Sequence, residues 1–196
     1  MDKEKNIQAV VSETEILHES SVNFLKIFEA YRVEKKISTR KLVQGLMSDR
    51  AFLDIKKGKY ILAKSDWEFL MQRMGIVTEY FETIVSRKEL EDWRIREDIC
   101  LLILENQSEA KKRLEQYRSK CLKEKKEIPK IQNQFCMKIT WLLSKSVLTA
   151  EELYDLSCKA VACTVAEEKW QEKLTTLYLG PAELETTLLT DRKSVV

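Results

Sequence analysis

Residues that interrupt helices are rare in this chain, which has only four glycines and two prolines among its 196 residues. Glycine and proline are the two residues that disfavour helix most strongly. The remainder is rich in leucine, glutamate, lysine and glutamine, which favour helix. With 44% hydrophobic and 34% charged residues, the composition is typical of a folded globular chain rather than a disordered one. The sequence therefore predicts an all-α fold, helical nearly throughout.

Residues that build catalytic or metal centres form no recognisable group. The five cysteines contain no Cys-x-x-Cys pair and lie among apolar residues, which favours buried reduced thiols. His18 is the single histidine, lies in a polar stretch and has no plausible serine or cysteine partner for catalysis. We therefore expect no catalytic residues, no metal and no cofactor. The sequence gives no persuasive acid–base or metal group among its carboxylates, such as those of Asp54, Asp66, Glu68, Asp92, Glu97 and Asp98.

The N-terminus is polar and no apolar run of about 18 residues follows it, so we expect neither a signal peptide nor a membrane span. This favours a cytoplasmic protein.

Charge is unevenly distributed along the chain, although the net charge is only +2. Residues 31–64 carry ten basic and three acidic side chains, whereas residues 65–110 carry five basic and eleven acidic ones. A small basic module followed by an acidic segment indicates a surface for a polyanion. Residues 111–130 are also basic, but their interleaved glutamates favour a solvated helix face.

Residues 20–75, which include the basic segment, contain signals for four helices. An amphipathic helix is expected over 20–36, with residues 1–19 as an arm or frayed helix. A second helix is expected over 40–46, with its N-cap at Ile37-Ser38-Thr39 and the turn at 45–47. It should bury Leu42 and either Val43 or Leu46. Ser48 is expected to cap the third helix, in which Phe52 and Ile55 face the core, and Gly58 to end it. Ser65 is expected to cap a fourth helix that carries Trp67 and stops at Gly75.

Beyond Gly75 the pattern predicts longer helices, at about 78–86, 88–106, 108–126, 129–146, 149–165, 167–178 and 181–189. Pro129 and Pro181 suit first helical turns, and Thr149-Ala150-Glu151-Glu152 is a capping box. Pairs of helices of about 18 residues with short connections form antiparallel hairpins, here repeating about every 40 residues. Trp93, Trp141 and Trp170 recur on these helices and are expected to pack in the core or line a groove.

The spacing of Ser38, Leu42, Leu46, Ser48, Phe52, Ile55, Gly58 and Lys59 is typical of a DNA-reading helical pair. The stretch from Ile37 to Lys59 resembles the repressor-like (Cro/lambda, XRE-type) helix-turn-helix family. The turn Gly45-Leu46-Met47-Ser48 and the pair Gly58-Lys59 resemble the Rgg-type regulators of Firmicutes, where tetratricopeptide-like helices follow this domain. The segment 177–185 resembles the repeat helices of that group. The alternative interpretation of this pattern is a small helical bundle that binds nothing.

The resemblance implies a DNA-binding transcriptional regulator that acts as a homodimer on double-stranded DNA and senses a peptide. It implies base contacts from Asp49, Arg50 and Leu53, with Arg50 the candidate for a bidentate contact to guanine. It implies phosphate contacts from Thr39, Arg40, Ser48, Lys57 and Lys59. The rival interpretation is a protein–protein adaptor with a degenerate helix-turn-helix, and a helical enzyme ranks third.

These expectations divide the chain into four parts. Residues 1–19 form an arm or frayed helix, 20–75 a DNA-binding domain and 76–190 a repeat and dimerisation domain. Residues 191–196, Asp-Arg-Lys-Ser-Val-Val, can be encoded by read-through of a common sequencing adapter. We therefore interpret them as an artefactual tail and expect the natural chain to be longer.

Overall fold

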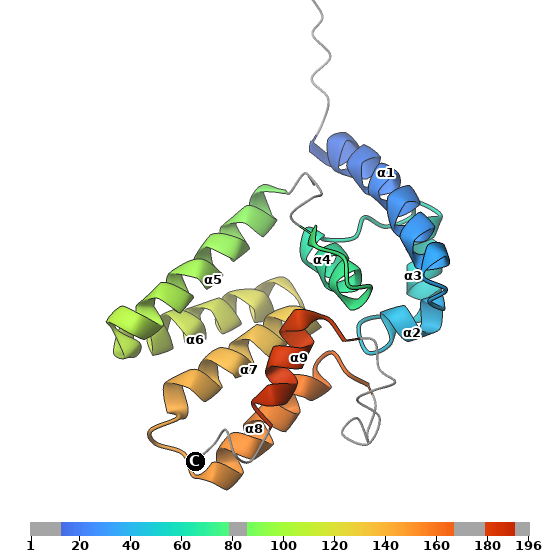
Figure 1. Ribbon diagram of the computed structural model, residues 1–196. Coiled ribbons are helices and arrows are strands. Elements are labelled where there is room, and N and C mark those ends of the chain that lie inside the picture. The colour runs from blue at the N-terminus through green and yellow to red at the C-terminus, as the bar shows by residue number, and fades with distance from the viewer. Residues whose placement is uncertain (1–12, 79–85, 167–178, 191–196) are drawn as a thin grey trace, which may run out of the picture.

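A computed structural model of the chain describes residues 13–78, 86–166 and 179–190, and within these ranges it is all-helical, without a strand (Figure 1). The expected helix over 167–178, most of the one over 78–86, Trp170 and the tail 191–196 lie outside the described residues. The helices, in chain order, are α1 Glu13–Glu34, α2 Thr39–Val43, α3 Asp49–Lys56, α4 Lys64–Arg73, α5 Arg87–Glu105, α6 Gln107–Glu124, α7 Lys130–Ser144, α8 Ala150–Ala162 and α9 Pro181–Leu188.

The helices α1 to α4 surround one hydrophobic cluster. The rings of Phe24 and Phe28 on α1 lie edge-on to Trp67 of α4, with centroids 5.0 and 5.1 Å apart. Phe28 also meets Phe52 of α3 at 5.7 Å, so one aromatic group joins three helices. Helix α1 begins at Glu13, seven residues before the expected start, so part of the presumed arm belongs to this helix.

The serine caps of α2 and α3 are confirmed, but α2 ends at Val43, three residues before its expected end, because Gln44 leaves the helical conformation and Gly45 adopts a φ of 80°. The Ser38 hydroxyl accepts a hydrogen bond from the Lys41 N–H at 3.4 Å, and the Ser48 hydroxyl accepts one from the Ala51 N–H at 3.1 Å. Gly58 ends α3 with a φ of 71°, a conformation that glycine adopts without strain. Each helix of this pair therefore begins where its cap predicts.

The expected cap of α4 is wrong. The backbone oxygen of Ala63 accepts the N–H groups of Asp66 and Trp67, so Ser65 already lies inside the first turn. Ala63 has no side chain that could satisfy the free N–H groups. Instead the carboxylate of Glu89, on α5, accepts the Lys64 N–H at 2.7 Å. A distant residue therefore does what a local cap would do.

Helices α5 to α8 follow one another as antiparallel neighbours (Figure 1). Asn106 alone separates α5 from α6, and its side chain caps α6 by accepting the Glu109 N–H at 3.1 Å. Ile99, Leu114, Tyr117 and Ile139 form the centre of a second hydrophobic cluster between α5, α6 and α7. The helix bounds differ from the expected ones by one to three residues.

The caps and tryptophans of α5 to α9 agree only in part with the sequence predictions. The capping box of Thr149 and Glu152 is confirmed at the start of α8. Pro129 precedes α7 as its N-cap rather than lying in its first turn, whereas Pro181 is the first residue of α9. Trp141 is buried as expected, but Trp93 is half exposed, because it lies on the face of α5 opposite Ile99. No helix within the described residues is long and apolar enough to cross a membrane.

Candidate nucleic-acid interface

Helix α3 has one buried and one exposed face. Phe52 is fully buried and Ile55 nearly so, which fixes the helix against α1 and α4. Asp49 and Arg50 in its first turn are exposed, and Leu53, one turn further on, remains 47% exposed. The predicted base-contacting side chains therefore share the surface that the core leaves open.

The predicted phosphate-contacting residues differ in their surroundings. Arg40 and Lys57 are exposed and, like Arg50, form no ion pair with any residue in the described ranges. Thr39, the first residue of α2, is partly buried. Lys59 is exposed, but its ammonium group lies 2.9 Å from a carboxylate oxygen of Asp54. Four of the five predicted residues, counting exposed Ser48, thus lie open to solvent, and one of these is already paired.

A further lysine of α3 is held by α1. The ammonium group of Lys56 lies 2.6 Å from Glu29, which also receives two hydrogen bonds from Arg32. Partial burial alone would raise the pKa of Glu29, but the hydrogen bonds from Arg32 and Lys56 lower it below its ordinary value. This ionised cluster fixes the end of α3 on α1.

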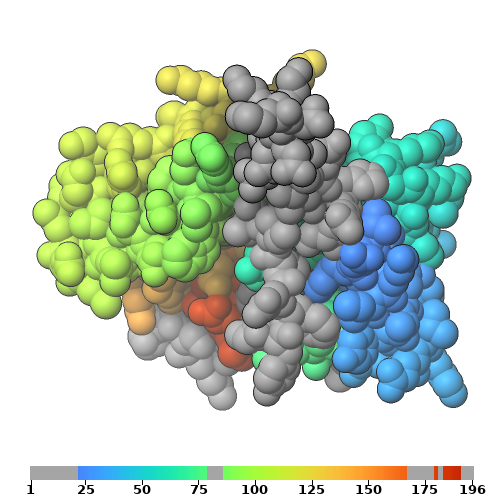
Figure 2. Space-filling view, turned by 90° about the horizontal axis from the view of Figure 1, so that it is seen from above, coloured from blue at the N-terminus to red at the C-terminus, as the bar shows by residue number. Residues whose placement is uncertain are grey.

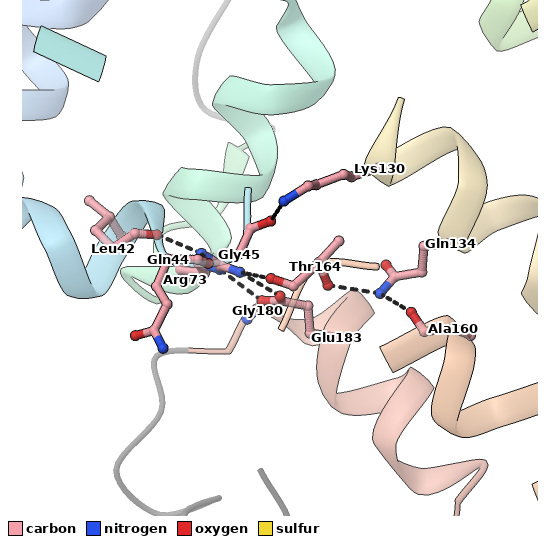
Figure 3. A network of polar contacts seen from close by, with 10 residues as sticks. All are labelled: Leu42, Gln44, Gly45, Arg73, Lys130, Gln134, Ala160, Thr164, Gly180 and Glu183. Carbon is pink, nitrogen blue, oxygen red and sulfur yellow. Dashed lines mark hydrogen bonds and ion pairs between the residues drawn. The ribbon is translucent and has the colours of Figure 1, made fainter. Parts of the chain in front are cut away.

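The turn between α2 and α3 lies against the start of α7 and the residues after α8 (Figure 3). We call the helices α5 to α9 the array. Gly45 has a φ of 80°, and a Cβ at this position would lie 1.8 Å from the backbone oxygen of Thr164, which follows α8. The ammonium group of Lys130, at the start of α7, donates a hydrogen bond to the Gly45 oxygen. Only glycine allows the turn to approach the array this closely.

Arg73, the last residue of α4, lies at the centre of this contact, and its side chain is almost fully buried. Two of its N–H groups donate to the carboxylate of Glu183 on α9, at 2.9 and 2.7 Å. The other three donate to the backbone oxygens of Leu42 (2.6 Å), Gln44 (2.8 Å) and Thr164 (3.1 Å). All five guanidinium donors are satisfied, as burial of this charge requires.

Glu183 and Gln134 extend the polar network into the array. Glu183 is buried and also accepts the Gly180 N–H at 3.0 Å, which closes the first turn of α9. The buried Gln134 amide on α7 donates to the Ala160 oxygen at 3.1 Å and to the Thr164 hydroxyl at 2.9 Å. The stretch around Thr164 is thus held by α7, while its backbone holds the turn at Gly45. We call Arg73, Glu183, Thr164 and Gly45 the docking cluster.

No local pattern in the sequence predicts this cluster. Arg73 has the pattern of an ordinary basic residue in a last helical turn, and Glu183 that of an acidic residue in a first turn. They are 110 residues apart, so no local spacing connects them. A buried arginine and a buried glutamate could be predicted to pair, but the sequence does not show that these two residues are buried.

The cysteines provide little chemistry. All five are free, and Cys100 is exposed, contrary to the expectation that they are buried. Burial raises the pKa of Cys136 to about 11, which keeps its thiol protonated and unreactive at neutral pH. In the part of the chain that the structure describes, no group of cysteine, histidine or acidic residues could hold a metal ion.

Comparison of the chain with protein-family models, curated proteins and solved structures finds no match.

Proposed function

We propose that this chain is a DNA-binding transcriptional regulator in which α2 and α3 form a repressor-like helix-turn-helix. The observation that carries the proposal is the exposed first turn of α3, whose opposite face is fixed by Phe52 and Ile55. A helix held in this way can enter the major groove, where base edges are distinguishable. Arg50 is exposed and without an ion pair among the described residues, so it is the base-reading residue in this proposal.

Affinity would come from contacts to the DNA backbone on either side of α3. The free N–H groups of the first turn and the hydroxyl of Ser48 suit a phosphate oxygen. Arg40 precedes this turn on α2 and Lys57 follows α3, and both have exposed charges. Lys59 would have to leave Asp54 to join them, so we assign it a smaller share than Lys57. Asp49 repels phosphate and fits only a contact to the amino group of a base, such as that of cytosine.

In this proposal α5 to α8 form a tetratricopeptide-like array of an Rgg-type regulator, which provides dimerisation and a site for a peptide. The docking cluster supports a link between the two parts, because buried contacts of α4 and of the turn at Gly45 with the array fix the reading helix relative to it. A peptide that moves α9 or the stretch around Thr164 would thereby alter the placement of α3.

A second candidate is a protein–protein adaptor with a degenerate helix-turn-helix. The pairing of Lys56 with Glu29 and of Lys59 with Asp54 favours it, because both ammonium groups already form ion pairs within the chain. Asp49 at the start of α3 favours it as well, since a carboxylate there opposes an approaching phosphate.

Binding of the full chain to duplex DNA distinguishes the two candidates. Preferred sites would be selected from a randomised duplex pool, and affinities for selected and random duplexes measured by fluorescence anisotropy. Arg50→Ala should reduce affinity for the selected duplex by about 5- to 150-fold more than for random duplex. Lys57→Ala should weaken both alike, and Lys111→Ala, an exposed lysine on α6, should change neither.

Equal losses for Arg50→Ala on both duplexes would show that Arg50 does not read a base. Failure of the wild-type chain to bind any duplex at low salt would refute the regulator and leave the adaptor.

A further inference from the structure

The outer face of α5 carries a stripe of exposed apolar side chains. They recur at intervals of three, eight and three residues, which places them on one side of a helix. The opposite side packs into the array through Ile99, which is fully buried. The members of the stripe are Leu90, Trp93, Leu101 and Leu104, with exposed fractions of 37, 51, 55 and 87%.

Helix α5 is the first helix of the array and packs against α6 and α7 (Figure 1). In the view from above, its surface is open along one side of the molecule (Figure 2). Single exposed apolar residues are normal, but four on one helix face, including a tryptophan, are typical of an interaction surface. The end of a helical array is also expected to be polar unless something covers it.

Two opposite charges lie on the same stripe. Arg94 and Glu97 are exposed, and neither forms an ion pair with a residue in the described ranges. Other charged residues of α5 are paired with α6, at 2.7 Å for Lys88 with Glu124 and at 2.8 Å for Asp92 with Lys120. The arginine and the glutamate therefore remain available at the middle of the stripe, three residues apart.

We propose that the partner of this surface is a second copy of the chain, with the two α5 helices packed antiparallel about a twofold axis. An axis between Ile95 and Arg96 places Arg94 opposite Glu97 of the other copy, and by symmetry this pair forms twice. The same axis places Leu90 opposite Leu101 of the other copy and brings the Trp93 rings close to the axis. Parallel packing would oppose Arg94 to Arg94 and Glu97 to Glu97, so charge complementarity selects the antiparallel arrangement.

The size of the contact sets the expected affinity. A helix of 19 residues is about 28 Å long, so one helix pair buries less than the roughly 800 Å² per partner of a standard interface. We therefore expect a weak dimer, with a dissociation constant in the micromolar range. This inference rests on the proposed function only in naming the dimer surface of that regulator. Its test contains no DNA, so its failure leaves the DNA-binding proposal untouched.

Sedimentation equilibrium of the full chain over a range of micromolar concentrations tests the proposal. The wild type should approach twice the 23.0 kDa monomer mass as concentration rises. Arg94→Glu and Glu97→Arg should each weaken the dimer by more than about tenfold, because each opposes like charges twice. The double variant, Arg94→Glu with Glu97→Arg, restores the complementary pairs and should recover the wild-type dissociation constant.

Two further variants complete the experiment. Trp93→Glu should abolish the dimer, and Val147→Glu, which places the same charge at a 75% exposed position before α8, should leave it intact. The helical signal in far-UV circular dichroism verifies that each variant is folded. A wild type that stays monomeric throughout the range overturns the proposal, and so does a double variant as weak as the single ones.

Discussion

The buried ion pair of Arg73 and Glu183 joins two parts of the chain that each have their own hydrophobic cluster. Replacing Arg73 with methionine keeps most of the side-chain volume but removes five donors. It leaves the Glu183 carboxylate buried without a cation, and it leaves the oxygens of Leu42 and Gln44 without this partner. Loss of one member of a buried pair typically costs about 3–5 kcal/mol.

The unpaired oxygens add to that cost. A buried acceptor without a partner costs about 1–3 kcal/mol, though water can reach part of the space that the guanidinium leaves. We therefore expect Arg73→Met to lower the free energy of unfolding by about 4–6 kcal/mol. This is a large share of the roughly 5–15 kcal/mol that stabilises an ordinary domain. Glu183→Gln should cost less, about 2–4 kcal/mol, because the amide oxygen still accepts one bond from Arg73.

Glu185 provides the matched control, because it lies on the same helix and pairs with Lys138 while 66% exposed. Glu185→Gln should change the free energy of unfolding by less than about 1 kcal/mol, as surface pairs do. Urea unfolding is followed by the fluorescence of single-tryptophan variants that retain either Trp67 or Trp141. In Arg73→Met the two probes should separate, because the link between the clusters is lost. Coincident transitions, or a loss no larger than that of Glu185→Gln, would refute the reasoning.

Three smaller changes test individual contacts by equilibrium unfolding. Gly45→Ala should cost about 1–3 kcal/mol more than Gly75→Ala, because both have positive φ but only the first would place a Cβ against Thr164; equal costs would mean that the turn does not press on the array. Ser48→Ala should cost about 1 kcal/mol by removing the cap of α3, and an unchanged midpoint would show that solvent replaces it. Burial raises the pKa of Asp66 from 3.8 to about 6. The neutral carboxyl of Asp66 therefore stabilises the fold by up to about 3 kcal/mol below pH 3.8. This contribution is lost as the pH rises through 6. Asp66→Asn should therefore stabilise the chain at pH 7.5 and change little at pH 3.5, and an equal effect at both values would contradict this assignment.

Local signals in the sequence predicted the all-α fold and many of the residues at which its helices begin and end. The serine caps of α2 and α3 and the capping box of α8 act on N–H groups two or three residues away, so their pattern is visible in sequence. The glycine that ends α3 is equally local. The exposed face of α3 follows from the burial of Phe52 and Ile55, which periodicity predicted.

Contacts between distant segments could not be predicted in this way. The first N–H of α4 is satisfied by Glu89, 25 residues later, so the choice of Ser65 as the cap was wrong. Trp93 is of a residue type that is usually buried, but it lies on the outer face of α5. Ile99 and its neighbours already fill the inner face. The docking cluster depends on a fold in which α9 returns to α4, and no single-segment pattern encodes that return.

The central claim, that the exposed surface around α3 binds the DNA backbone and bases, is tested most directly by the salt dependence of duplex binding. Each phosphate contact contributes a slope of about −0.9 to the logarithm of affinity against the logarithm of salt concentration. The wild type should bind at low salt and lose affinity steeply as salt increases. Lys57→Ala should make the slope shallower by about one per protomer, while Lys111→Ala leaves it unchanged. No binding at low salt, or an affinity that does not depend on salt, would contradict the account.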